Sequence, residues 1–118
     1  MSYDLLFWRE VQGANLDPQS VLEQLEEGEE FDGIIPLPLK VVTDAFKRSF
    51  PKIALNGTGL DWEGEGSYFQ VEFIFLDGDT VLAISISCGY QLLKSDSAMN
   101  ALGVVAHDLG CRVHDLQS

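Results

Sequence analysis

The stretch "SYFQVEFIFLDGDTVLAISISC", from Ser67 to Cys88, decides the fold. Its first half alternates with a period of two, the period at which the side chains of a β-strand change faces. One predicted face is apolar (Phe69, Val71, Phe73, Phe75) and the other is mixed (Tyr68, Gln70, Glu72, Ile74). The dipeptide Asp77-Gly78 that follows is favoured in tight hairpin turns. The stretch therefore predicts an antiparallel hairpin with one core face.

The second half of the hairpin, "TVLAISISC", continues the alternation. It predicts one face made of Leu82, Ile84, Ile86 and Cys88, and another made of Val81, Ala83, Ser85 and Ser87. Because the first set is large and apolar, we expect it to join the phenylalanine face of the first strand in the core.

Three helices are predicted outside the hairpin, each with residues that can begin and end it. The first begins at Asp17 and Pro18 and stops near Gly28, the second runs from about Pro38 to Phe50 before Pro51, and the third begins at Ser95 or Ser97 and ends at Gly110. Apolar residues recur along each at helical spacing, which predicts one buried face per helix. These are Val21, Leu22 and Leu25; Leu39, Val42, Ala45, Phe46 and Phe50; and Ala98, Ala101, Leu102, Val105 and Leu109.

Three more strands complete the prediction. "YDLLFW" (Tyr3–Trp8) is typical of a strand buried on both faces, "LDWEG" precedes the hairpin, and "CRVHDL" follows the last helix. The order is β-α-α-β-β-β-α-β within a single domain, residues 1–118. Because the strands cluster and the helices lie outside them, we expect an α+β fold, an antiparallel sheet with about three helices packed mainly on one face. The second and third helices should cover the phenylalanine face.

Composition places the chain among ordinary globular domains. No apolar segment approaches the roughly 20 residues of a membrane span. The N-terminus lacks the basic-then-apolar pattern of a signal peptide, since Asp4 comes early and Arg9 late. Cys88 and Cys111 border apolar strands and predict buried thiols rather than a disulfide. We therefore expect a cytoplasmic protein that does not associate with membranes.

The net charge of −12, from 19 acids and 7 bases, is the one extreme property of the composition. It argues against nucleic acid and anionic membranes as partners, because both are bound through clusters of Lys and Arg. It favours fast association with a basic protein. Most acids fall in two blocks, residues 1–32 and 53–79, whereas residues 40–52 carry four bases. Solubility is the other explanation, although a smaller charge would supply it.

The run "DWEGEG" lies in the second acidic block. On an extended strand Asp61, Glu63 and Glu65 share one side, spaced roughly 6.5–7 Å apart, which is too wide for one cation but makes a negative stripe. Trp62 and Tyr68 add rigid aromatic area of the kind found in binding hot spots. The run lacks the spacing and the distal glutamate of a calcium loop. Three interpretations are open: a solvated strand end, a protein-binding stripe, and a catalytic or metal site.

The first acidic block contains "EQLEEGEEFDG", at and just past the end of the first predicted helix. Its carboxylates are Glu23, Glu26, Glu27, Glu29, Glu30 and Asp32. They face the negative pole of the helix dipole, which costs about a few tenths of a kcal/mol per charge. The block is either a solvated helix end that tolerates this cost or a surface used for binding.

The C-terminal run "HDLGCRVHDL" holds both histidines, with Cys111 between His107 and His114, and could supply three ligands to zinc. A glycine separates a helix from a strand there, so we expect these side chains to diverge. "SCGYQLL" offers Cys88 as a nucleophile at a strand end, although a packed turn is the simpler interpretation. Gly-x-Ser-x-Gly and phosphate-binding glycine motifs are absent from the sequence. We predict no enzyme activity, no metal and no cofactor.

Four segments, "MSYDLLFW", "EGEGSYFQVEF", "CGYQLLK" and "LGCRVHD", resemble short bacterial proteins of uncharacterised or immunity type, which often neighbour polymorphic toxins. The resemblance implies a small, acidic, cytoplasmic and non-enzymatic protein that blocks a toxin domain by covering its active site. It carries over no role for an individual residue.

Charge and resemblance together predict a non-enzymatic immunity or inhibitor protein that neutralises a basic toxin, such as a nuclease-like effector domain. The predicted contact residues are Glu26, Glu27, Glu29, Glu30, Asp61, Trp62, Glu63 and Glu65. A single interface requires that both acidic blocks share one face of the fold.

The alternative function is a small cytoplasmic regulatory domain that binds a ligand or partner. A third hypothesis is an enzyme that uses Cys88 or the His107, Cys111 and His114 cluster. The mixed face of the first hairpin strand could be solvent-exposed or a dimer surface.

Overall fold

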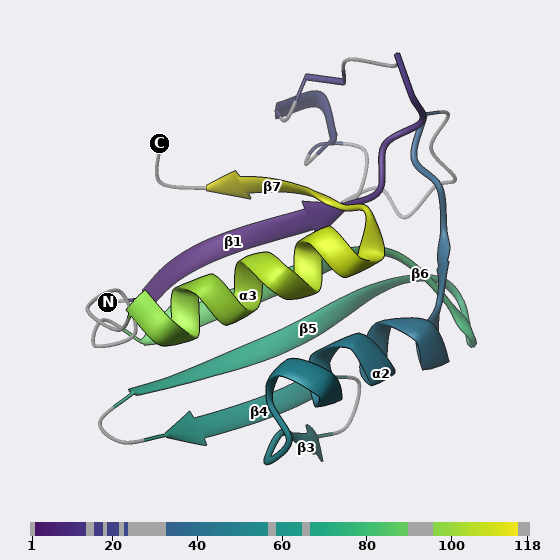
Figure 1. The fold of residues 1–118 in the computed structure, drawn as a ribbon. Helices are drawn as coiled ribbons and strands as arrows, with labels where there is room; N and C mark the ends of the chain where they lie inside the picture. The colour runs from purple at the N-terminus through teal and green to yellow at the C-terminus, as the bar shows by residue number, and fades with distance from the viewer. Residues whose placement is uncertain are drawn as a thin grey trace.

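The computed structural model describes residues 2–13, 16–17, 19–21, 23, 33–56, 59–64, 67–89 and 96–115. They form one antiparallel sheet with two helices side by side on one of its faces (Figure 1). The strands are β1 (Ser2–Trp8), β2 (Leu37–Pro38), β3 (Ala54–Asn56), β4 (Gly59–Gly64), β5 (Ser67–Asp77), β6 (Thr80–Gly89) and β7 (Arg112–Asp115), and the helices are α2 (Leu39–Ser49) and α3 (Asp96–Leu109). This architecture confirms the predicted α+β fold.

The strands lie in the order β3-β4-β5-β6-β1-β7, and β2 pairs with the beginning of β6. β1 is therefore an interior strand, although it comes first in the chain. Leu6, for example, pairs with Ser85 of β6 on one side and with His114 of β7 on the other. Phe7 and Trp8 are 1% and 0% exposed, although successive side chains point to opposite faces. At these two residues β1 is therefore buried on both faces, as predicted.

The inner face of the sheet carries the main hydrophobic core. Phe69, Val71 and Phe73 of β5 are buried there beneath the helices, with Phe46 of α2 and Leu102 of α3. This confirms that the second and third predicted helices cover the phenylalanine face. Each such side chain contributes about 1.5–3 kcal/mol through burial, so this face supplies most of the stabilisation.

The predicted faces of β6 are correct from Ala83 onward and reversed at its beginning. Val81 packs into the inner core, whereas Leu82 packs into a cluster on the outer face. Ile74 of β5 pairs with Ala83, but the next residue of β5 pairs with Val81. Leu82 is therefore an extra residue, a β-bulge, which shifts the alternation by one.

A second, smaller core covers part of the outer face. It consists of Leu6, Trp8, Val21, Ile34, Leu82 and Ala83. Val21 belongs to a helical stretch whose described residues are 19–21 and 23, and its backbone N–H donates to the carbonyl of Asp17 (3.0 Å). The predicted start of the first helix is thus confirmed, and its predicted end near Gly28 lies outside the described residues. This stretch packs on the face opposite α2 and α3.

Glu10 links the sheet to the stretch that packs on its outer face, residues 16–17 and 19–21, which we call the covering segment. Its Oε1 accepts hydrogen bonds from Trp8 Nε1 (3.3 Å), from the backbone N–H of Leu16 (3.1 Å) and from Arg112 Nη1 (3.2 Å). Arg112 also donates to the Leu16 carbonyl (3.2 Å) and lies 5.7 Å from the centroid of the Trp8 ring. The network satisfies buried polar groups and fixes the covering segment on one half of the outer face.

The ends of the helices and the hairpin turn follow the predicted signals. Gly110 ends α3 at φ +67°, donating to the His107 carbonyl (3.0 Å), while the N–H of Cys111 donates to Ala106 (2.8 Å), which is a Schellman motif. At the hairpin turn, the N–H of Asp79 donates to the Asp77 carboxylate (3.0 Å). That bond and a further one from the Thr80 side chain lower the pKa of Asp77 below its ordinary value. The two short strands β2 and β3 were not predicted, because two or three residues show no periodicity.

Candidate functional site

The part of the outer face that the covering segment leaves open is polar. Residues paired across antiparallel strands share a face, so the register locates their side chains. One row crosses four strands, from Asp61 of β4 through Gln70 and Ser87 to Asp4 of β1. On either side of this row, Glu63 pairs with Tyr68, and Glu72 pairs with Ser85. We call these eight residues the acidic sheet face: Asp4, Asp61, Glu63, Tyr68, Gln70, Glu72, Ser85 and Ser87.

The acidic sheet face is accessible to a partner. Glu63, Gln70 and Glu72 are exposed, Asp4 and Asp61 are half-buried, and Tyr68 is 53% exposed. The Tyr68 ring lies over Gly89, because a Cβ at that glycine would come within 2.7 Å of the ring. The absence of a Cβ at Gly89 leaves room for the ring, as in aromatic–glycine pairs of other sheets. Tyr68 thereby presents a supported aromatic surface beside the carboxylates.

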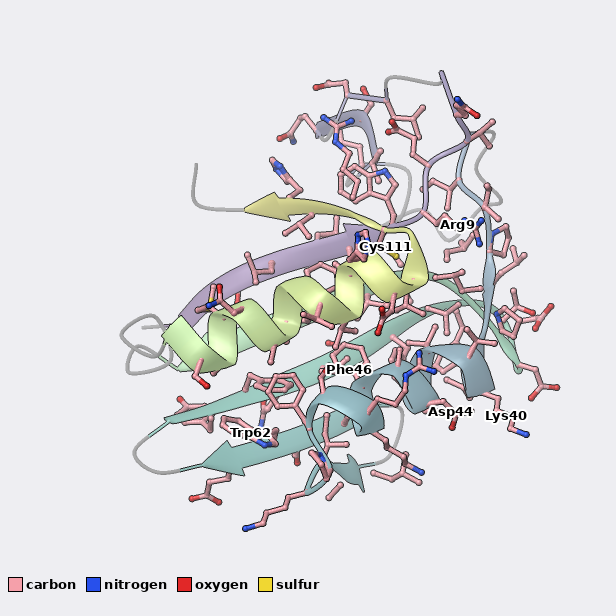
Figure 2. The ribbon with its side chains drawn as sticks, in the orientation of Figure 1. Arg9, Lys40, Asp44, Phe46, Trp62 and Cys111 are labelled. Carbon is pink, nitrogen blue, oxygen red and sulfur yellow. The ribbon has the colours of Figure 1, made fainter. Side chains whose placement is uncertain are left out.

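The acidic sheet face and the largest group of bases lie on opposite sides of the sheet. The acidic sheet face has four carboxylates and no Lys or Arg among its eight residues. Four of the seven bases of the chain instead follow α2 and the turn after it: Lys40, Lys47, Arg48 and Lys52. α2, which carries Lys40 (labelled in Figure 2), packs on the inner face, so the sheet lies between these bases and the acidic sheet face. The eight residues of the acidic sheet face therefore carry a net negative charge, which steers cationic groups towards them.

The structure divides the predicted contact residues. Asp61 and Glu63 lie together on the acidic sheet face, and Trp62 points to the opposite side of β4. The other five, Glu26, Glu27, Glu29, Glu30 and Glu65, lie outside the described residues, so a shared face for the two acidic blocks stays a prediction.

Trp62 is half-buried against the inner core rather than displayed with the acids. Its ring stacks on Phe69, with centroids 5.3 Å apart and an interplanar angle of 22°, and meets Phe50 edge to face at 5.2 Å. It also lies over Gly64, where a Cβ would collide with the indole. Trp62 therefore closes the edge of the core, and only its remaining exposed side can contact a partner.

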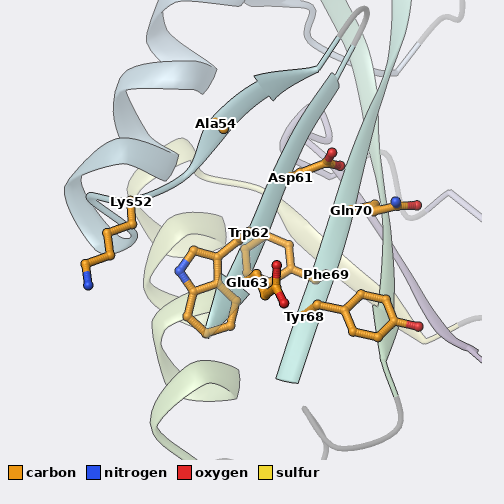
Figure 3. Close-up of a pocket in the computed structure, with 8 residues that line it drawn as sticks. All are labelled: Lys52, Ala54, Asp61, Trp62, Glu63, Tyr68, Phe69 and Gln70. Carbon is orange, nitrogen blue, oxygen red and sulfur yellow. The ribbon is translucent and has the colours of Figure 1, made fainter. Parts of the chain in front are cut away.

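A hollow of about 440 Å³ lies at the edge of β4 (Figure 3). Figure 3 shows Trp62 and Lys52 on one side of the strand and Asp61, Gln70 and Tyr68 on the other. The lining residues are Lys52, Ala54, Asp61, Trp62, Glu63, Tyr68, Phe69 and Gln70. The hollow thus joins the acidic sheet face to the exposed side of Trp62.

Sequence reasoning did not include Asp4 and Glu72 among the contact residues. Glu72 had a usable signal, since the period-two alternation already put it beside Tyr68 and Gln70 on the outer face. Asp4 had none, because its place beside Ser87 comes from the pairing of β1 with β6. Such long-range pairing has no local signature.

The residues considered for catalysis do not form a reactive group. Burial raises the pKa of the Cys88 thiol to about 11, with the charge of Asp4 adding to the effect. Burial also raises the pKa of Cys111 to about 12, partly opposed by Arg9. A nucleophilic thiol needs the opposite shift. His114 lies beside the Trp8 ring (6.2 Å between centroids) and His107 is on the exposed side of α3.

The described part of the chain contains no group of three or more His, Cys, Asp or Glu side chains that could hold a metal ion. Within the same residues, the helices are too short or too polar to cross a membrane. No protein-family model matches the chain, and neither curated proteins nor solved structures give a match.

Proposed function

We propose that this chain is a non-enzymatic immunity or inhibitor protein of the bacterial cytoplasm, which binds a basic protein toxin through the acidic sheet face and neutralises it. A nuclease-like effector domain is the partner with the best chemical fit. Such a domain holds phosphates with Lys and Arg, and carboxylates on a complementary surface can occupy those cationic positions.

The observation that supports the proposal most directly is the composition of the acidic sheet face. Asp4 of β1, Glu72 of β5 and the two acids of β4, Asp61 and Glu63, come from three separate places in the sequence, yet all four lie on one face of the sheet. Like charges on neighbouring strands disfavour folding. A cationic partner would remove this repulsion between the carboxylates when it binds. Tyr68 adds aromatic area of the kind that anchors protein interfaces.

Rescue of bacteria from the toxin tests this function. The chain is co-expressed with each domain from a neighbouring gene that kills the host when it is expressed alone, and survival is compared between variants. The triple variant Asp61→Asn, Glu63→Gln, Glu72→Gln is expected to lose rescue and to weaken binding by about a hundredfold or more at low salt.

The matched control removes the same number of charges from the other side of the molecule. Asp44, Asp79 and Asp108 are exposed on or beside the helical layer, and their neutralisation to Asn should leave rescue intact. If the acidic-face variant still rescues cells as well as this control, the proposed function is wrong.

A second candidate function has one observation in its favour. A mostly apolar groove of about 580 Å³ runs beside α2, lined by Pro38, Leu39, Thr43 and Leu55 and bordered by two lysines, Lys40 and Lys47, and two aspartates, Asp44 and Asp79. Its volume suits a small amphipathic ligand with a charged group, as a regulatory ligand-binding domain would require. Thermal shift with fatty-acid-like anions tests it, and a rise in Tm that Lys47→Glu abolishes would support this alternative.

A further inference from the structure

We propose that the partner binds by adding an extended segment to the open edge of β4, with a Lys or Arg facing Glu63 and Asp61 and an apolar side chain against Trp62. This mode of binding rests on the proposed function, because it takes the partner to be a basic protein. It specifies which backbone edge the partner uses.

The edge is open because β4 is longer than its neighbour on one side. All six residues of β4 pair with β5, from Gly59 with Glu72 to Gly64 with Ser67. On the other side, β3 pairs only with Gly59–Asp61. Within the part of the chain that the structure describes, no strand flanks residues 62–64 on that side. Backbone N–H and C=O groups of an edge are a template for another strand.

The course of the chain before β3 explains why no described strand lies beside residues 62–64 on this side. α2 ends at Ser49 with Phe50 as its C-cap, and the N–H of Ile53 donates to the Phe50 carbonyl (2.9 Å), which turns the chain into β3. Lys52 and Ala54 border the space without filling it, and the 440 Å³ hollow lies there. An incoming strand would continue the line of β3.

The side chains at this edge specify the occupant. An added strand alternates faces as β4 does, so its residues meet Trp62 on the inner side and Glu63 on the outer side. On the inner side Trp62 also borders a second hollow of about 330 Å³, with Phe50, Pro51 and Ala98 among its lining residues, which can take an apolar side chain. On the outer side Glu63 and Asp61 favour a cation. The edge therefore fits a segment that alternates basic and apolar residues.

A second copy of this chain is a poor occupant for the same reason. Antiparallel pairing of two β4 edges would bring Glu63 and Asp61 of one copy close to the same residues of the other, and like charges across strands repel. Acidic side chains at the edge thus exclude self-association while leaving the edge open to a basic segment.

The test uses an acetylated and amidated pentapeptide of alternating lysine and valine, titrated into the isotopically labelled full chain. We expect saturable binding, slowed amide hydrogen exchange within residues 62–64, and magnetisation transfer between valine methyls and the Trp62 indole. A pentapeptide of alternating lysine and proline has the same charge but fewer backbone donors. The lysine–proline peptide should bind at least about tenfold more weakly than the lysine–valine peptide.

Two protein variants sharpen the result. Glu63→Lys is expected to abolish binding of the lysine–valine peptide, whereas Glu72→Lys, on the adjacent interior strand, should weaken it by less than about fivefold. Strand addition is wrong if the lysine–proline peptide binds as well as the lysine–valine peptide, or if binding of the lysine–valine peptide does not saturate. It is also wrong if that peptide changes the chemical shifts of Asp4, Tyr68 and Glu72 alone. The proposed function survives each of these outcomes as long as the Asp61, Glu63 and Glu72 triple variant loses rescue. The proposed function itself is wrong if that triple variant still rescues cells.

Discussion

Tyr68 and Phe69 are neighbours in the chain and belong to opposite chemical environments. Phe69 is 0% exposed between Phe50 and Trp62 under the helices, and Tyr68 is 53% exposed on the outer face with carboxylates around it. One residue step along β5 thus separates the side of the sheet that stabilises the fold from the side to which we propose that a partner binds. Because successive residues alternate faces, the two roles can be altered separately by mutation.

The largest difference between the two faces should appear in stability. Phe69→Ala is expected to lower the free energy of unfolding by about 3–5 kcal/mol, because it removes a fully buried ring and leaves a cavity. Tyr68→Ala should lower it by less than about 1 kcal/mol. Urea unfolding followed by tryptophan fluorescence measures both. Similar losses for the two variants would contradict the separation of roles.

The buried thiol of Cys88 should make stability depend on alkaline pH. Its pKa is raised from 9.0 to about 11 in the folded chain. Below pH 9 both folded and unfolded states hold the proton, so this group has no effect. Between those two values the unfolded chain releases the proton and the folded chain retains it, so the free energy of unfolding falls as pH rises.

The same shift predicts that at pH 8 the folded thiol reacts with a disulfide reagent about a hundredfold more slowly than the thiol in urea. Absorbance of the released thiolate measures the rate, and Cys88→Ala isolates the contribution of Cys111. Equal rates in the folded and unfolded chain would show that Cys88 is not on the protected inner face.

A smaller loss of stability is expected from a change at the aromatic–glycine pair of the outer face, Tyr68 and Gly89. Gly89→Ala should cost about 1–2 kcal/mol and displace the Tyr68 ring, since the new Cβ would lie 2.7 Å from it. Gly103→Ala is the matched control, because nothing lies within 4 Å of a Cβ there, and in α3 it should instead stabilise by about 0.5–1 kcal/mol. Chemical shifts of the Tyr68 ring and urea unfolding report both effects.

The smallest expected effect is that of removing charge from the acidic sheet face. Glu63→Gln with Glu72→Gln should change stability by no more than about 0.5 kcal/mol, in the stabilising direction at low salt, because both carboxylates are exposed and repel their neighbours. Raising the salt concentration should remove the difference. A large loss of stability would mean that these acids hold the fold together instead of serving a partner.

The sequence predicted what repeats locally and missed what depends on pairing. The alternation of β5, the Asp77-Gly78 turn and the Gly110 helix end are local signals, and each is confirmed. The reversal at Val81 and Leu82 was missed because a bulge is visible only against the partner strand. In the candidate site, Asp61 and Glu63 were predicted on one side correctly, as a strand requires. Trp62 was grouped with them although the same alternation places it on the other side.

β1 gives the molecule a particular order of assembly. Its first partner, β6, begins at Thr80, and its second, β7, begins at Arg112, so its ladders close only when distant parts of the chain meet. Contacts of such long separation slow folding, because the entropy of closing the loop is lost before the contacts form. During synthesis on the ribosome, the apolar residues of β1 must therefore wait until β6 and β7 have emerged. The sheet is expected to close only after β7 is made, and chaperone binding to β1 would protect its apolar residues in the interval.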